Sequence, residues 1–252
     1  MAARSYGQYC GVTTAVELIG ERWAMLIVRD LLVGPRRYTD LKQGLPRIPT
    51  NILSTRLKEL QEGGVVRRVP LHNCGLVYEL TDYGRALEPI VIALGRWGFQ
   101  AMGEPAEGDV VTPDSLTMAL RTAFQADAAA DAEYELQVGD VALRASVRAG
   151  TLAVAQLAPD VPAPERPSSR FARSGTGAQR RDEGRSVRGG EADVVIVAGP
   201  GIRRLIAGEL TPAEAIEQDV LAVVRGDVSW LDSFARTFHI APLAALTKEK
   251  AS

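Results

Sequence analysis

The sequence lacks the residues on which several classes of protein depend. Its 252 residues include only two cysteines and two histidines, without a CxxC spacing, so there are too few ligands for a structural zinc site. No apolar run approaches the roughly 18 to 20 residues of a membrane span, and the opening MAARSYGQYCG has no apolar core of a secretory signal. We therefore expect a cytoplasmic protein with no metal, no membrane contact and no structural disulfide.

The motifs of common enzymes are absent as well. There is no GxSxG motif, no P-loop and no pair of metal ligands. The segment Gly199-Pro200-Gly201 resembles the start of a dinucleotide-binding fingerprint, but Arg204 stands where the third glycine belongs. We interpret it as a strand-to-helix turn, and we predict no catalytic residue, no cofactor and no enzymatic activity.

The charges are unevenly distributed, although the net charge is only −2. Residues 1–103 contain 13 Lys and Arg against 9 Asp and Glu, whereas the remainder contains 16 against 22. A basic first part joined to an acidic second part suggests that only the first part would contact a polyanion such as DNA.

The segment from Pro49 to Glu62, PTNILSTRLKELQE, predicts a short amphipathic helix that Gly63 and Gly64 terminate. Its apolar face would pack inward. The opposite face is polar and could reach phosphates and base edges in a major groove. The residues of this polar face are Thr50, Asn51, Ser54, Thr55 and Lys58, with Arg56 at its edge.

The order of the neighbouring segments favours DNA binding over a merely solvated helix. A short helix, Tyr38–Gly44, precedes the polar-faced helix, and two β-rich runs, Val65–Val69 and Val77–Leu80, follow it. This order is typical of a winged helix-turn-helix. Four arginines lie where a helix start and a wing would meet phosphates, and we predict that they bind them: Arg36, Arg37, Arg67 and Arg68.

A long helix is expected next, from Thr81 or Asp82 to about Phe99. Its apolar face is wider than one small domain needs, which favours a homodimer interface. Docking of the second domain on the same face is the alternative. The residues predicted for the interface are Leu87, Ile90, Val91, Leu94 and Trp97.

The first part resembles the HxlR-type transcriptional regulators, a branch of the MarR-like winged-helix proteins. The resemblance is carried by Cys10 and by the runs Leu18–Leu41, Leu45–Arg68 and Val77–Gly98. It implies a homodimer whose recognition helices enter successive major grooves of double-stranded DNA. Cys10 stands where several members of that family have a redox- or electrophile-sensing cysteine, so a Cys10-based sensor and a plain residue at a helix start are both open. The wing tip, Pro70–Leu76, departs from the pattern because it carries no Arg or Lys.

The second part alternates short strands with helices. After a Gly- and Pro-rich linker we expect a helix, a mainly antiparallel sheet and a final helix that Ser229 caps. Thr211 to Glu214 forms a capping box that begins another helix. The run Leu205–Phe234 is similar to sterol-carrier-protein-2-like domains, which implies a hydrophobic tunnel for a small apolar ligand. Trp230, Phe234 and Phe238 would line that tunnel or form plain core.

The predicted organisation is therefore a two-domain protein, an α+β winged helix-turn-helix followed by an α+β sterol-carrier-like domain. The first domain spans residues 1–103, a linker 104–113, the second domain 114–240 and a tail 241–252. A segment at about 159–190 with seven arginines is predicted to be a disordered insertion, with nonspecific DNA contact as an alternative. We expect a dimeric regulator of transcription with a hydrophobic effector. The rival hypothesis is a lipid or acyl carrier whose winged helix only contacts proteins.

Overall fold

The computed structural model describes residues 5–71, 75–157 and 191–242. The wing tip at 72–74, the arginine-rich segment 158–190 and the end of the predicted tail lie outside the described residues, so the predictions for them and for Cys74 stay predictions. The winged-helix part, residues 11–99, contains α1 (Gly11–Ile19), α2 (Ala24–Val33), α3 (Tyr38–Gly44), α4 (Thr50–Glu62), β1 (Val66–Leu71), β2 (Gly75–Leu80), α5 (Asp82–Arg85) and α6 (Glu88–Phe99).

The winged-helix part forms around the apolar faces that the sequence predicts. Leu53, Leu57 and Leu60 of α4 are fully buried against Ile27 and Leu31 of α2 and their neighbours. Helix α4 ends where Gly64 takes a left-handed conformation, with φ of +69°, and the Val65 N–H donates to the Leu60 carbonyl. The predicted polar-faced helix and its glycine stop are thus confirmed.

The wing is an antiparallel pair in which Val66 lies opposite Leu80 and Leu71 opposite Gly75. Arg36 adds a short third segment, because its N–H donates to the Tyr78 carbonyl and its own carbonyl accepts from the Tyr78 N–H. The backbone before α3 is therefore hydrogen-bonded to the wing, which fixes α3 and the wing relative to each other.

The prediction of one continuous helix from Thr81 to Phe99 is wrong. The chain forms the single turn α5 and then α6, with Pro89 in the first turn of α6. A proline has no N–H to give to a preceding turn and fits best at a helix start, so it separates the two helices. Gly84 in α5 packs so closely that a Cβ there would lie 2.1 Å from the Val65 carbonyl oxygen.

The C-terminal part, residues 113–240, is α+β, as expected. Its sheet has the order β5-β4-β3-β6-β7, in which only β3 and β6 are parallel. The sheet is therefore mixed and mainly antiparallel. The elements are α7 (Pro113–Ala123), the 3-10 turn η1 (Ala126–Ala128), β3 (Ala132–Val138), β4 (Val141–Arg148), β5 (Thr151–Gln156), β6 (Val194–Ala198), α8 (Ile202–Ile206), α9 (Pro212–Glu217), β7 (Leu221–Gly226) and α10 (Trp230–Thr237).

Of the two caps predicted at Thr211 and Ser229, the structure has the first; the cap at Thr112 was not predicted. The capping box of Thr211 and Glu214 at α9 is present, and Thr112 with Ser115 begins α7 in the same way. Ser229, however, makes no side-chain cap, and that prediction is wrong. The Asp227 carboxylate accepts the Ser229 N–H instead, which is the Asx-turn alternative to a serine cap.

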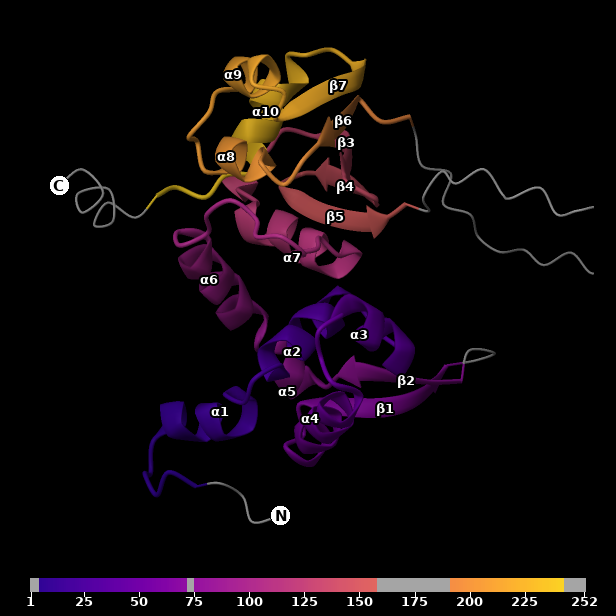
Figure 1. The fold of residues 1–252 in the computed structure, drawn as a ribbon, viewed down its shortest axis with the longest axis vertical. Coiled ribbons are helices and arrows are strands. Elements are labelled where there is room, and N and C mark those ends of the chain that lie inside the picture. The colour runs from indigo at the N-terminus through magenta and orange to yellow at the C-terminus, as the bar shows by residue number, and fades with distance from the viewer. Residues whose placement is uncertain (1–4, 72–74, 158–190, 243–252) are drawn as a thin grey trace, which may run out of the picture.

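Helix α7 lies between the two parts and belongs to the core of both (Figure 1). Met118 packs in the winged-helix core, whereas Leu116, Leu120 and Ala123 pack under the sheet of the C-terminal part. The helix α4 and the wing lie at the end of the molecule away from that sheet (Figure 1). The winged-helix part and the C-terminal part are therefore joined by a helix that belongs to both cores.

Within the described ranges, no helix has the length and apolar character to span a bilayer. Nor do three His, Cys, Asp or Glu side chains of those residues gather as metal ligands would.

Candidate DNA-binding surface

The outward face of α4 presents a row of polar side chains. Thr50, Asn51, Ser54 and Lys58 are exposed and Thr55 is half-buried, whereas the leucines of the opposite face are buried. Because the buried face anchors the helix, the polar row is held on the surface. Lys58 lies 3.7 Å from Glu62, but both side chains are mostly exposed, so this pair is weak and easily replaced by a phosphate contact.

Hydroxyl groups on this surface are oriented by local hydrogen bonds. Ser54 donates to the Thr50 carbonyl, and Thr55 donates to the Asn51 carbonyl at 2.9 Å. The Tyr38 hydroxyl of α3 donates to the same Thr50 carbonyl at 2.8 Å and lies 3.2 Å from the Ser54 hydroxyl. Sequence reasoning missed Tyr38, because only the folded chain places α3 beside the start of α4. The Tyr38 hydroxyl oxygen can still accept a hydrogen bond, and the hydroxyl could instead donate its proton to a DNA phosphate.

Three of the predicted phosphate-binding arginines remain exposed. Among the described residues, no acidic side chain pairs with Arg37 at the start of α3. Arg67 on β1 pairs with Glu79 on β2 at 2.6 Å, and the Arg68 guanidinium lies 5.7 Å from the centre of the Tyr78 ring. These contacts hold the two wing arginines on the surface without burying them.

Arg36 and Arg56 are not on this surface. The Arg36 guanidinium donates to both carboxylate oxygens of Asp114 in α7, at 2.6 and 2.9 Å, and its side chain is only 19% exposed. Arg56 is 14% exposed and forms ion pairs with Glu21 and Glu59. Both guanidinium groups are therefore bound to carboxylates of the protein, and the structure corrects their assignment as phosphate contacts.

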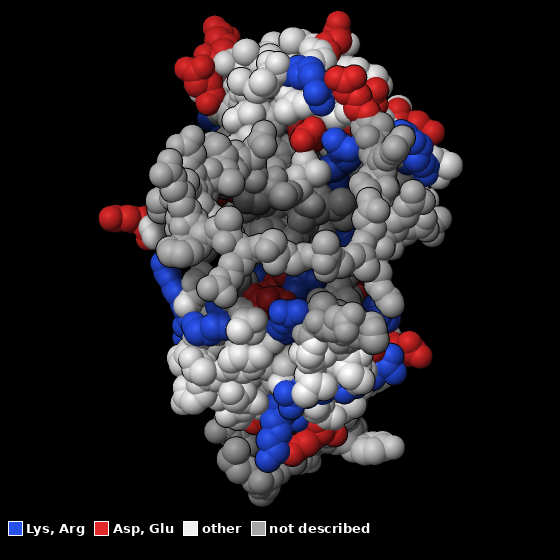
Figure 2. All heavy atoms as spheres, turned by 90° about the vertical axis from the view of Figure 1, so that its right-hand side faces the viewer, with Lys and Arg blue, Asp and Glu red and all other residues white. Residues whose placement is uncertain are grey.

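The face of the molecule toward the wing shows the expected separation of charge. Figure 2 shows basic side chains predominating on the winged-helix half of this face and acidic ones gathering at the far end of the C-terminal part. A DNA duplex along α4 and the wing would therefore meet mainly positive charge and stay away from the acidic end.

The predicted dimer residues divide into two groups. Val91 is buried in the winged-helix core, and Leu87 is half-buried beside it. Ile90, Leu94 and Trp97 are 52%, 47% and 69% exposed and lie on one face of α6. The opposite side of α6 packs on α7, where a Cβ on Gly95 would lie 3.1 Å from Thr122. The C-terminal part therefore docks on one side of α6 and leaves the apolar row free.

Helix α1 carries further exposed apolar side chains. None of its residues is buried, and Val12 and Val16 are 72% and 42% exposed. Cys10, at the N-cap of α1, is exposed as well, and hydrogen bonds from the Thr13 and Val12 backbone amides lower the pKa of its thiol. In Figure 1, α1 and α6 lie on the same side of the molecule.

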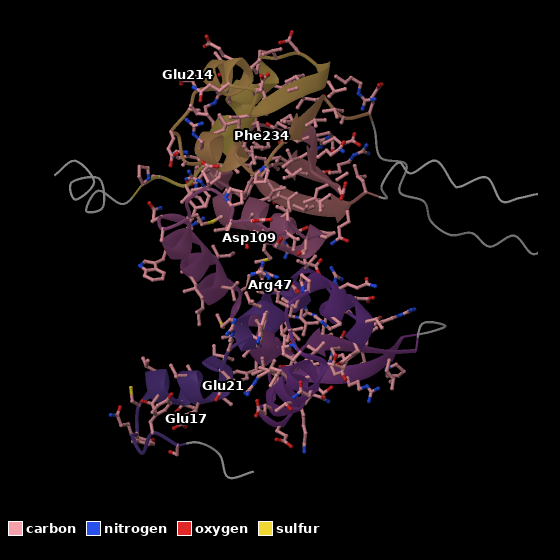
Figure 3. All side chains as sticks on the ribbon, in the orientation of Figure 1. Glu17, Glu21, Arg47, Asp109, Glu214 and Phe234 are labelled. Atoms are coloured by element: carbon pink, nitrogen blue, oxygen red, sulfur yellow. The ribbon has the colours of Figure 1, made fainter. Side chains whose placement is uncertain are left out.

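The three aromatic residues predicted for a ligand pocket form core instead. Phe234 and Phe238 are completely buried, and Trp230 is partly buried. All three surround the ring of Tyr134 from β3, with ring centres 5.5 to 6.5 Å away. Phe234 lies inside the C-terminal part in Figure 3. Tyr134 fills the space that a tunnel along these side chains would need.

Two cavities lie elsewhere in the described part of the molecule. The first, about 530 Å³, lies between the two parts of the molecule. The second, about 470 Å³, lies beside η1 and the end of α10, and Arg236 and His239 contribute to it. None of the three aromatic residues lines either cavity.

Comparison with known proteins identifies the winged-helix part. Residues 18–105 match the model of the HxlR-like helix-turn-helix family. The HTH-type transcriptional regulator YvaP of Bacillus subtilis (strain 168) is 41% identical over 85 residues, which cover 33% of this chain and 79% of YvaP. The chain belongs to the HxlR-like helix-turn-helix family.

Other relatives of this HxlR-like protein match the same part. The regulator YkvN of B. subtilis (strain 168) is 34% identical over 113 residues, 43% of this chain and 96% of YkvN. The solved reduced form of the transcriptional regulator YodB from B. subtilis is 32% identical, covers 40% of this chain and 100% of YodB, and has a TM-score of 0.33. The chain is thus a DNA-binding protein of transcription regulation with a winged helix-turn-helix.

Proposed function

We propose that this protein is a homodimeric, sequence-specific regulator that inserts α4 of each protomer into the major groove of double-stranded DNA. The supporting observation is the exposed polar row on α4, which is anchored by buried leucines and flanked by exposed basic groups on α3 and the wing. As a regulator of transcription it would act in the cytoplasm.

Base contacts are assigned to the row on α4, and phosphate contacts to its flanks. Asn51 can pair with adenine through the oxygen and the nitrogen of its side-chain amide, while Thr50, Ser54, Thr55 and Lys58 complete the groove contacts. Arg37, Arg67 and Arg68 would neutralise phosphates and fix the register of the protein on the duplex. Arg36 and Arg56 are left out because their ion pairs occupy them.

The second copy would cover the apolar row of α6 and the exposed face of α1. A dimer reads half-sites about one helical turn apart, so the spacing of the two α4 helices decides whether both can bind. The C-terminal part packs on the other side of α6, through α7. It is therefore in a position to influence that spacing.

The decisive experiment is a fluorescence-anisotropy titration of a DNA fragment from upstream of the protein's own gene, against a shuffled fragment of the same length. A preference of about a thousandfold or more is expected for a specific regulator. Asn51→Ala should reduce that preference, because a good bidentate base contact contributes about 1–3 kcal/mol of discrimination.

The phosphate contacts are tested by salt dependence. Arg37→Ala should weaken binding to both fragments about equally and lower the slope of log affinity against log salt by about one. Arg148→Ala is the matched control, because Arg148 is an exposed arginine on β4 of the C-terminal part. Equal effects of the two substitutions would show that the basic face of the winged helix does not bind DNA.

The C-terminal part is proposed as a regulatory domain that binds a small effector, with domain limits at 1–103 and 114–240. Its mixed five-stranded sheet with helices is compatible with the sterol-carrier-protein-2-like arrangement that the sequence resembles. Because Trp230, Phe234 and Phe238 form core, the effector would bind elsewhere in this part than along those residues.

Two rival functions make different predictions. A lipid carrier whose winged helix contacts only proteins would bind DNA without a steep dependence on salt. A regulator that senses oxidants through Cys10 is supported by the exposure of the thiol and by its lowered pKa. In that case Cys10→Ser would abolish the response of DNA binding to an electrophile such as diamide and leave basal DNA affinity unchanged.

A further inference from the structure

The cavity of about 530 Å³ between the two parts of the molecule is formed by elements of both. Leu32 at the end of α2, Arg85 of α5 and Glu88 at the start of α6 come from the winged-helix part. Arg121 and Phe124 at the end of α7 come from the C-terminal part, and Gly150 to Leu152 add the turn before β5. Its volume lies in the range of small-molecule sites.

The cavity carries an excess of positive charge. Arg121 donates to the Leu32 carbonyl at 3.0 Å and lies 3.7 Å from Glu88, so it is held toward the cavity. Arg85 has neither a hydrogen bond nor an ion pair of its guanidinium with any residue that the structure describes. Among the described residues, two guanidinium groups therefore line the cavity with one carboxylate, and that of Arg85 has no hydrogen-bond or ion-pair partner.

Three of the remaining lining side chains are apolar: Leu32, Phe124 and Leu152. Leu32 is buried in the winged-helix core, and Phe124 packs against the C-terminal core with its ring centre 6.2 Å from that of Phe238. Leu152 is half-buried beside them. A flat or short apolar body would fit between these side chains while an attached anion reached the arginines.

We propose that this cavity binds a small organic carboxylate with an aromatic or short aliphatic body, and that this carboxylate is the effector of the regulator. Arg85 would be its main anion contact, Arg121 a second one, and Phe124 its apolar wall. The effector role rests on the proposed function in DNA regulation, whereas the binding site does not.

The location explains how such a ligand would act. Arg85 lies in the turn α5 that directly follows the wing, and Glu88 begins α6, whose apolar row is assigned to the dimer. A carboxylate bound between α5 and α7 would change two sets of contacts together: those at the end of the wing and those at the start of α6. If the protein exchanges between two arrangements of these elements, the ligand shifts their populations only as far as its affinities for the two arrangements differ.

Binding is tested by calorimetric titration of the full chain, without DNA, with phenylacetate and with its neutral amide, phenylacetamide. The carboxylate should bind about tenfold or more tightly than the amide, because hydrogen bonds to a charged group are the stronger ones. Arg85→Gln should remove this preference, and it breaks no side-chain hydrogen bond or ion pair among the described residues. Arg236→Gln, which removes the arginine of the second cavity, is the matched control and should leave binding unchanged.

A substitution that is expected to strengthen binding distinguishes a specific effect on this site from a general loss of fold. Glu88→Gln removes the one carboxylate of the cavity and releases Arg121 from its pair. It should therefore tighten phenylacetate binding several-fold, which a damaged fold would not do. The proposal is overturned if carboxylate and amide bind alike, if Glu88→Gln weakens binding, or if Arg236→Gln rather than Arg85→Gln abolishes it.

Coupling is measured by repeating the DNA titration at saturating phenylacetate. A change of several-fold in affinity in the parent protein and none in Arg85→Gln is expected. Unchanged DNA affinity with intact phenylacetate binding would overturn the effector role alone. Absence of DNA binding with intact phenylacetate binding would instead refute the proposed DNA function.

Discussion

Asp30 of α2 is a charged group in a place where charge is costly. Its side chain is fully buried, one oxygen accepts from Arg29, and the other has no hydrogen-bond partner among the described residues. Burial raises its pKa from the ordinary 3.8 to about 6, against the opposing effect of Arg29. Asp114 raises the pKa further and Arg36 lowers it.

This buried carboxylate makes stability depend on pH in a definite direction. The folded state holds the proton more tightly than the unfolded state, so the contribution of Asp30 to the free energy of unfolding falls as pH rises from about 4 to about 6. A shift of this size corresponds to about 3 kcal/mol. Asp30→Asn should abolish this fall and be more stable, relative to the parent protein, at pH 7 than at pH 3.5.

The measurement is urea unfolding of both proteins across this pH range. Asp140→Asn, in the exposed turn between β3 and β4, is the control and should keep the pH dependence of the parent. A difference between Asp30→Asn and the parent protein that did not vary with pH would show that Asp30 is already ionised at low cost.

At the scale of single elements, α6 carries a prediction about assembly. Trp97 and Val224 are almost equally exposed, at 69% and 67%, but Trp97 belongs to the apolar row of α6 and Val224 to β7. Trp97→Glu should convert the proposed dimer to a monomer, because it would bury a charge in the proposed interface. Analytical ultracentrifugation would show a halved mass for Trp97→Glu and the parent mass for Val224→Glu.

The consequence for DNA binding follows from the same element. A monomer presents one α4 helix and loses the half-site that its partner would contact. Trp97→Glu should therefore bind the operator fragment about as weakly as the shuffled fragment. A variant that remained dimeric, or a Val224→Glu variant that dissociated, would move the interface away from α6.

The elements were predictable where their pattern is local. The alternation of Leu53, Leu57 and Leu60 with polar residues, followed by two glycines, identifies α4 without knowledge of its neighbours. The break at Pro89 could have been found from the proline itself. The aromatic spacing of α10 could not decide between core and tunnel, because the ring that fills the space is Tyr134, on a strand about a hundred residues earlier.

Contacts between segments far apart in the sequence could not be predicted from such local patterns. Arg36 stands next to Arg37 in the sequence, yet Arg36 is paired with a carboxylate 78 residues away and Arg37 is exposed on the surface. Nothing local distinguishes these two arginines. The inter-part cavity is hidden for the same reason, because its walls come from five separate elements.

At the scale of the whole molecule, α7 makes the two parts cooperative. Met118 and Leu120 are neighbours on α7 but lie in different cores, and the Asp114–Arg36 pair connects the start of α7 to the backbone segment beside the wing. Gln156 of β5 also donates to Asp114, at 2.8 Å. We therefore expect urea unfolding to show a single transition for both parts.

The Asp114–Arg36 pair tests that continuity. Asp114→Ala should lower the free energy of unfolding by about 3 kcal/mol, because it leaves a largely buried guanidinium without its partner. The double variant Arg36→Met/Asp114→Leu should recover much of this loss, since two apolar side chains need no ionic partner.

A second ion pair, between the α3–α4 connection and the segment before α7, provides the control. Arg47 and Asp109 point toward each other between the two parts in Figure 3, but they are 3.9 Å apart, with side chains 69% and 53% exposed. Asp109→Ala should therefore change stability by less than about 1 kcal/mol. Two separate unfolding transitions in the parent protein, or equal losses in Asp109→Ala and Asp114→Ala, would mean that α7 does not couple the winged helix to the C-terminal part.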